Sequence, residues 1–359
     1  MLKIIDIYII KKFLGTFFYA ISLLILIVII FDISENLDSF IQKEAPLKAI
    51  IFDYYLNFIP YFINLFIYLF TFISVIFFTS KLAGDSEIIA ILSSGVSFWR
   101  LLYPYMISAI ILAILSFYLG NFLIPKTNEQ RRAFKNAYME NLIKDKSKNL
   151  HIQIAPSTFV FVESYNSKKN IGYKFSLEKF DGQKMVFKLM ANRITLDTVD
   201  NSWILKNYFI RTFDSTGQSL VKGAELDTTL FLNPKDLYKV KEEFEEMDYY
   251  ELNKFILSEK QKGSKAYKKF EIEKHKRASG PIAIIILTII GVALSSRKVR
   301  GGIGMHLGVG IGLTFSYILL IQVSTVFSTY GNLSPLIASW IPNFIFLIIA
   351  IYLLIKAPK

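Results

Sequence analysis

The sequence contains no cysteine and little charge. Of its 359 residues, 19% are charged and 53% are hydrophobic. Without cysteine there is no disulfide framework, no thiolate chemistry and no cysteine metal site. Such a small charged fraction in such an apolar chain excludes a disordered protein and an ordinary soluble one.

Residues for catalysis are also scarce. The three histidines, His151, His275 and His306, lie on separate segments without a partner at helical spacing, so we expect no metal site. No Gly-x-Ser-x-Gly lies near a predicted strand and no histidine suggests a triad. The glycine-rich stretch 301–312 is not followed by Gly-Lys-Ser/Thr, so it is not a P-loop. We therefore expect no catalytic site, no cofactor and no ATP hydrolysis by this chain itself.

Long hydrophobic runs are abundant. A membrane-spanning helix needs about 20 apolar residues. The last charge-free stretch is too long for one span, but turn residues between Tyr330 and Pro335 divide it. The sequence therefore predicts six membrane helices, three on each side of a polar insert, with a kink at Pro60 in the second. The stretches without Asp, Glu, Lys or Arg are 13–31, 54–80, 101–124, 280–296 and 301–355.

Basic residues are unevenly distributed over the short flanks of these spans. One alternating set of flanks holds ten and the other holds only Lys43 and Lys48, which predicts cytoplasmic termini and an insert on the outer face. The first span is long for a signal peptide and lacks a clear cleavage site, so we interpret it as a retained anchor. The ten residues are Lys3, Lys11, Lys12, Lys81, Arg100, Arg297, Lys298, Arg300, Lys356 and Lys359.

The insert is basic and rich in predicted strands. Residues 126–277 hold 29 Lys and Arg against 21 Asp and Glu, so this part suits anionic partners. Apolar alternation over 151–231 predicts six or more strands, with Tyr173, Phe175 and Leu177 on one face. Strands without intervening helices suggest a sandwich or jelly-roll. Residues 234–277 are typical of charged helix.

Three domains follow from these patterns. We expect residues 1–125 to form the first three membrane helices, 126–278 the inserted β domain with a helical return, and 279–359 the last three membrane helices. The predicted fold class is therefore an α-helical membrane protein with an inserted extracytoplasmic, all-β, jellyroll-like domain.

The cytoplasmic segment 84–100 predicts a short helix of its own. Asp85 or Ser86 can cap it, Glu87 suits its positive end, and Gly95 suits the left-handed residue that ends it. The segment is either an interfacial connector or a docking helix for a cytoplasmic partner, and the spacing alone leaves both open.

A stripe of small residues marks the fifth span. Gly304, Gly308, Gly312 and Ser316 recur every four residues, which lets another helix approach closely. That helix belongs either to this chain or to a second subunit. Asp53, at the outer entrance of the second span, marks a polar pathway or is solvated by head groups, and both remain open.

In order and topology the chain resembles the LptF/LptG permeases, which work with a cytoplasmic ATPase to move lipopolysaccharide onto a periplasmic bridge. The resemblance covers nearly the whole chain. Its most specific parts are Ser86-Glu87-Ile88-Ile89-Ala90 through Gly95, Arg297 through Gly302 with the glycine stripe, Glu273 to Pro281, and Pro60.

The resemblance implies residue roles. Glu87 would pair with a basic residue of the ATPase, and the first and fifth spans would form a lateral gate for lipid. Some family members carry a basic residue near the outer end of the first span, but here Phe31 to Glu35 hold none. The implied ATPase-coupling residues are Asp85, Ser86, Glu87, Ala90, Gly95 and Arg100, and the candidates for lipid phosphate are Lys43, Lys48, Arg131 and Arg132.

By this resemblance we expect a permease subunit, with a lean toward the LptG-like member, in the Gram-negative inner membrane. Its expected partners are a homologous permease, a dimeric ABC ATPase, a periplasmic jellyroll bridge protein and lipopolysaccharide, with no nucleic acid. The alternatives are a membrane-anchored receptor or scaffold and an ABC exporter of another lipid or lipoprotein. An intramembrane enzyme is more remote, because the uncharged spans offer no catalytic pair.

Overall fold

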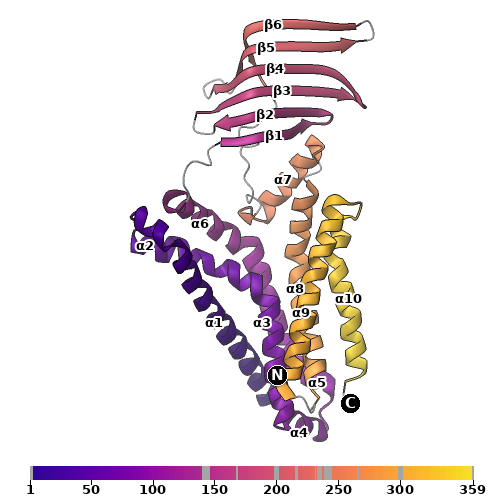
Figure 1. The fold of residues 1–359 in the computed structure, drawn as a ribbon. Helices are drawn as coiled ribbons and strands as arrows, with labels where there is room; N and C mark the ends of the chain where they lie inside the picture. The colour runs from indigo at the N-terminus through magenta and orange to yellow at the C-terminus, as the bar shows by residue number, and fades with distance from the viewer. Residues whose placement is uncertain are drawn as a thin grey trace. The chain divides into compact units, whose positions relative to one another are not determined.

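The chain folds into two compact units. The computed structural model describes residues 3–139, 146–166, 169–197, 202–214, 217–230, 232, 237, 245–264, 267–297 and 302–357. The helical unit comprises Met1–Met139, Glu245–Tyr250 and Lys268–Lys359, and the β unit comprises Glu140–Phe244 and Glu251–Tyr267. Figure 1 shows both units along the chain.

Among the residues that the structure describes, six helices are long and apolar enough to cross a membrane, as predicted. Figure 1 places the two ends of the chain beside α4, at one end of this unit. Ser334 accepts a hydrogen bond from the backbone N–H of Ile337 and so begins the last helix after the expected turn. The helical elements are α1 (Ile4–Gln42), α2 (Leu47–Ala49), η1 (Ile50–Tyr55), α3 (Leu56–Gly84), α4 (Glu87–Ser93), α5 (Phe98–Tyr118), η2 (Leu119–Leu123), α6 (Ile124–Tyr138), α7 (Tyr249–Lys262), α8 (Tyr267–Ser295), α9 (Gly302–Tyr330) and α10 (Pro335–Ile355).

Two π-helical turns interrupt the spans where the sequence combines asparagine with proline. η1 lies just before Pro60, and η2 lies just before Pro125. Proline has no N–H to donate, so the carbonyl four residues before it, which is that of Leu56 for Pro60, loses its helical partner. The Asn57 amide donates to the carbonyls of Phe52 and Asp53 at 3.0 and 2.9 Å. π-Turns of this kind are frequent at functional sites.

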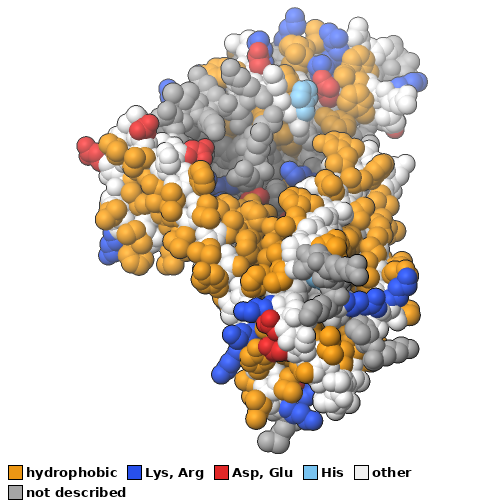
Figure 2. Space-filling view, turned by 60° about the horizontal axis from the view of Figure 1, so that its bottom comes forward, with side chains coloured by type: hydrophobic (Ala, Val, Ile, Leu, Met, Phe, Trp, Pro, Cys, Tyr) orange, Lys and Arg blue, Asp and Glu red, His pale blue; other side chains and the backbone are white. Residues whose placement is uncertain are grey.

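Burial divides the six spans into an inner and an outer group. The most apolar window of α8 is 72% buried, whereas those of α1 and α9 are only 22% buried. Figure 2 shows the resulting belt of hydrophobic side chains on the visible surface of the helical unit. A belt this wide suits lipid or another apolar protein surface. α1 and α9 therefore present most of their side chains outside the helical unit.

The described strands of the β unit form one antiparallel sheet in chain order. This confirms an inserted β domain, with the described strands arranged as a meander. Trp203, Val162 and Leu205 are fully buried in its core, and the Trp203 indole donates to the Leu232 carbonyl at 3.2 Å. The strands are β1 (Lys146–Ala155), β2 (Thr158–Asn166), β3 (Ile171–Asp181), β4 (Lys184–Asp197), β5 (Ser202–Asp214) and β6 (Gly217–Thr228).

One face assignment in β3 is wrong. Phe175 and Leu177 are buried as expected, but Tyr173 is 46% exposed. Lys174 between them has a φ of +51°, which interrupts the simple alternation of side chains along the strand. A turn at Asp181-Gly182, where Gly182 has a φ of +58°, joins β3 to β4.

Parts of several other predictions fall outside the described residues. These are Pro234 at the start of the helical return, positions 298–301 before the glycine stripe, and Lys359.

Candidate functional site

The predicted short helix of segment 84–100 is α4. Gly95 has a φ of +86° and follows the last turn, as expected. Ser86 occupies the N-cap position, but its side chain makes no capping bond, because Ser86 itself is left-handed at φ +64° instead of extended. Asp85 is the C-cap residue of α3 and does not cap α4.

α4 has an inner and an outer face. Ile88 is fully buried in a cluster shared by α1, α3 and α5, whereas Glu87 and Ala90 are exposed and Ile89 is 54% exposed. The carboxylate of Glu87 lies in the first turn, where the helix dipole favours a negative charge. The helix is therefore anchored by Ile88, with Ile91 and Leu92 packed against the same cluster, and it presents a carboxylate beside exposed apolar neighbours.

Arg100 has a partner inside the helical unit. Its Nη1 and Nη2 donate to Oδ1 and Oδ2 of Asp6 at 2.7 and 2.6 Å, and Asp6 is only 2% exposed. Ser97 accepts a bond from the Arg100 N–H at 3.3 Å and caps α5. Sequence reasoning missed Asp6, although an acid three residues after Lys3 at the start of a span is the signal of a helix first turn.

The glycine stripe faces away from the other described helices. A Cβ built on Gly304, Gly308 or Gly312 meets no described atom of another element within 4 Å, and Ser316 is exposed. Gly310, which the sequence did not single out, makes the close approach instead, with a built Cβ against Ile76 of α3. The helix that packs on the stripe was expected to belong either to this chain or to a second subunit, and the described part of this chain supplies no such helix.

The C-terminal third of α1 carries an acid held by two tyrosines. Tyr54 and Tyr55, both buried in or beside η1, donate their hydroxyls to Asp32 at 3.1 and 2.9 Å. Lys43 and Lys48 lie exposed beyond this contact, on the corner between α1 and α2. The region that carries a basic residue in some relatives is therefore a site of attachment between α1 and η1.

The two candidate arginines of α6 differ in their surroundings. The guanidinium of Arg131 lies over the rings of Phe58 and Tyr61, 5.9 and 5.3 Å from their centroids. Arg132 forms an ion pair with Glu246 at 2.5 Å. Since Arg132 already shares its charge with a carboxylate, Arg131 is the better candidate for an anionic lipid group.

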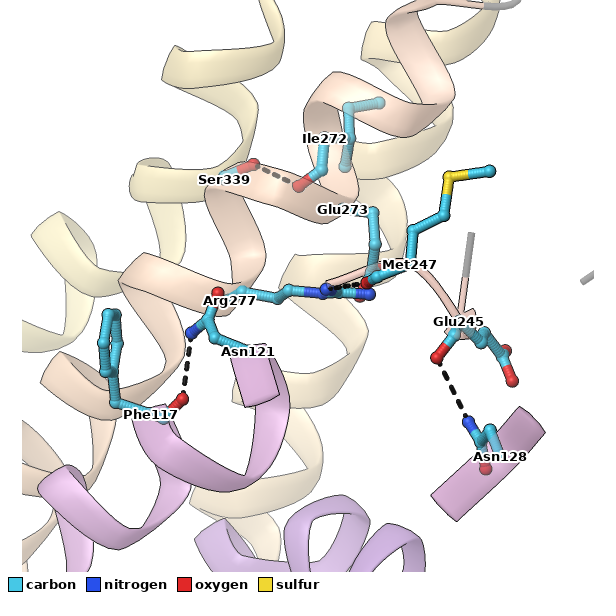
Figure 3. A network of polar contacts seen from close by, with 9 residues as sticks. All are labelled: Phe117, Asn121, Asn128, Glu245, Met247, Ile272, Glu273, Arg277 and Ser339. Atoms are coloured by element: carbon cyan, nitrogen blue, oxygen red, sulfur yellow. Dashed lines mark hydrogen bonds and ion pairs between the residues drawn. The ribbon is translucent and has the colours of Figure 1, made fainter. Parts of the chain in front are cut away.

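Hydrogen bonds from polar side chains hold the segment that returns to the helical unit after the sheet (Figure 3). Asn128 of α6 donates to the Glu245 carbonyl at 3.3 Å, and Arg277 of α8 donates to the Met247 carbonyl at 2.8 Å. Glu273 accepts from the Arg277 Nε at 3.5 Å and orients it. The returning segment is thus fixed to both α6 and α8 by side chain to backbone bonds.

Comparison with known proteins decides the family. The family model described as lipopolysaccharide export system permease LptF/LptG matches residues 7–356. The chain belongs to this family. A search of curated proteins finds no match.

Membership in the LptF/LptG family has direct consequences. The protein is a transport component and a multi-pass inner-membrane protein, consistent with its six apolar helices. The match spans both the helices and the inserted β domain, so the family likeness is not restricted to one unit.

Proposed function

We propose that this LptF/LptG permease is one subunit of an ABC exporter that extracts lipopolysaccharide from the inner membrane and passes it to a periplasmic bridge. In this proposal the chain pairs with a homologous permease and binds one copy of a dimeric cytoplasmic ATPase. The termini and α4 lie in the cytoplasm, and the β unit lies in the periplasm.

The observation that supports the ATPase partnership is the two-sided character of α4. An exposed carboxylate at Glu87 beside exposed Ile89 and Ala90 suits a groove that offers one basic side chain and an apolar floor. The buried Ile88 fixes this helix to the same apolar cluster as α1 and α5. A partner that displaces α4 therefore displaces side chains packed on the membrane helices.

Lipid entry in this proposal uses the least buried helices. The outer faces of α1 and α9 are apolar, and the stripe on α9 permits close approach by a helix of the second permease. Lipopolysaccharide enters between the two subunits, and Arg131, Lys43 and Lys48 are the candidate contacts for its phosphates.

A charge reversal at α4 tests the function. Glu87→Arg places like charges in the docking contact, which disfavours binding by several kcal/mol. The matched control is Glu129→Arg, another exposed glutamate of the helical unit, on α6. We expect a tagged wild-type chain in gentle detergent to co-purify an ATPase, a second permease and lipopolysaccharide.

The variants separate docking from folding. Glu87→Arg should lose the ATPase and keep the second permease, while Glu129→Arg should keep both. Recovery of a wild-type monomer with neither ATPase nor lipid would refute the exporter and favour a receptor or scaffold. Normal ATPase recovery with Glu87→Arg would refute the role of α4.

A further inference from the structure

Asp6 and Arg100 form a polar joint between the inner ends of α1 and α5. All four atoms of the bidentate pair lie within 2.7 Å of their partners, and Asp6 also accepts from the Lys3 N–H at 2.7 Å. A fork-on-carboxylate contact fixes direction as well as distance, which a single ion pair does not. Asp6 is buried, so the joint is shielded from water on that side.

The joint lies directly after the ATPase-docking segment in the chain. Gly95 ends α4, Ser97 caps α5, and Arg100 belongs to the first turn of α5. A short capped connection transmits displacement because few backbone torsions lie between the two helices. Movement of α4 therefore reaches Arg100 before it reaches any deeper part of α5.

Apolar packing around the joint supports the same route. Ile88 of α4 shares its buried cluster with Ile9 and Phe13 of α1 and with Leu101 and Tyr105 of α5. Such contacts are non-directional, and packed helices can slide along them. The bidentate pair adds the directional element that keeps α1 in register with α5.

α1 is held by apolar packing along one face and by polar contacts at two points. Only 22% of its most apolar window is buried. In the part of the chain that the structure describes, its side chains make polar contacts with other elements at Asp6, near its start, and at Asp32, near its outer end. These two contacts add directional fixed points to the apolar packing, so displacement of Asp6 is passed along the helix.

We propose that the Asp6–Arg100 pair is the positioning joint through which displacement of α4 by the ATPase moves α1, and so opens or closes the lipid path beside it. The inference rests on the proposed exporter function. The pair touches neither lipid nor nucleotide and acts through the helix that it holds.

The first test measures coupling in the complete complex. The exporter with its ATPase and second permease is reconstituted in vesicles containing lipopolysaccharide, and lipid release and ATP hydrolysis are measured together. For Asp6→Asn we expect ATP hydrolysis within about two-fold of wild type. For Asp6→Asn and Arg100→Gln alike we expect a loss of about ten-fold in lipid released per ATP. The control is Lys188→Gln, which breaks the half-buried 2.7 Å pair with Glu178 in the β unit and should leave the ratio unchanged.

The charge-swapped chain, Asp6→Arg with Arg100→Asp, distinguishes loss of the ion pair from a local packing defect caused by the single substitutions. It should recover part of the lost ratio. A wild-type ratio in both single variants would overturn the inference and leave the exporter standing, whereas absence of ATPase from the wild-type complex would refute the exporter itself.

The second test uses the chain with the joint intact. Because the sequence contains no cysteine, Ile5→Cys and Trp99→Cys provide two unique spin-label sites, both on exposed side chains. We expect the distance between the labels to stay constant when the complex binds a non-hydrolysable ATP analogue, and to change when Asp6→Asn is added. A change in the distance with Asp6 and Arg100 both present would show that α1 and α5 move separately and would overturn the joint.

Discussion

Two glycines of the membrane helices should respond in opposite ways to the same substitution. A Cβ built on Gly291 of α8 lies 2.8 Å from Cγ1 of Val75, 3.2 Å from Cβ of Val75 and 3.2 Å from Cε2 of Phe72. A Cβ built on Gly308 of α9 meets no described atom of another element within 4 Å. Alanine therefore overpacks the first position and fits the second.

The size of the difference follows from these distances. Carbon atoms prefer a separation of about 3.5–4.0 Å, so Gly291→Ala overlaps Val75 by roughly 0.7–1.2 Å. Val75 is β-branched and has essentially one χ1 rotamer in a helix, so the backbones must separate. Overpacking of this kind costs about 1–3 kcal/mol. Gly308→Ala lacks this penalty and gains up to about 1 kcal/mol of helix propensity.

Thermal unfolding of the isolated chain in detergent, followed by intrinsic fluorescence, measures the first effect. We expect Gly291→Ala to lower the midpoint and Gly308→Ala to leave it unchanged or raise it. Co-purification of the second permease measures the other effect, because Gly308→Ala should weaken pairing if the stripe faces that subunit. Equal destabilisation of the isolated chain by both variants would refute the placement of α9.

Two further predictions concern the ends of the moving elements. Asp32→Ala leaves the buried hydroxyls of Tyr54 and Tyr55 without their carboxylate, so the free energy of unfolding in detergent should fall by about 1–3 kcal/mol. The control, Asp38→Ala at an exposed position of the same helix, should change it little. Equal unfolding midpoints for the two variants would show that the contact does not stabilise the chain. Gly95→Val forces a β-branched residue into a φ of +86° and should weaken co-purification of the ATPase. Gly95→Asn should retain the ATPase, because asparagine tolerates the left-handed region. Full recovery of the ATPase with Gly95→Val would show that docking does not require this helix end.

Local patterns in the sequence were sufficient for the elements themselves. Charge-free length predicted the six spans, the turn near Tyr330 predicted the division of the last stretch, and alternation predicted the inserted strands. The left-handed Gly95 after a short helix was also predictable, since few other residues adopt that conformation. In β3, however, the positive φ of Lys174 moves Tyr173 off the expected face. The alternation of residue types does not predict such a backbone irregularity.

The site depended more on contacts distant in sequence. The guanidinium of Arg100 binds Asp6, 94 residues earlier in the chain, and no local pattern indicated this pairing. Arg131 and Arg132 look equivalent in the sequence, yet one lies over aromatic rings and the other pairs with Glu246. Such pairings depend on how helices are placed, and residue type alone does not specify a partner.

By itself the sequence determined that this protein is a six-helix membrane protein with an inserted β domain, because hydrophobic length and periodicity are local properties. Only the tertiary structure decided which glycine of α9 packs on α3 and which lie free, since every face of a membrane helix is apolar. It also decided that Asp6 and Asp32 hold the two ends of α1, because hydrogen bonds require positions in space and not only residue types.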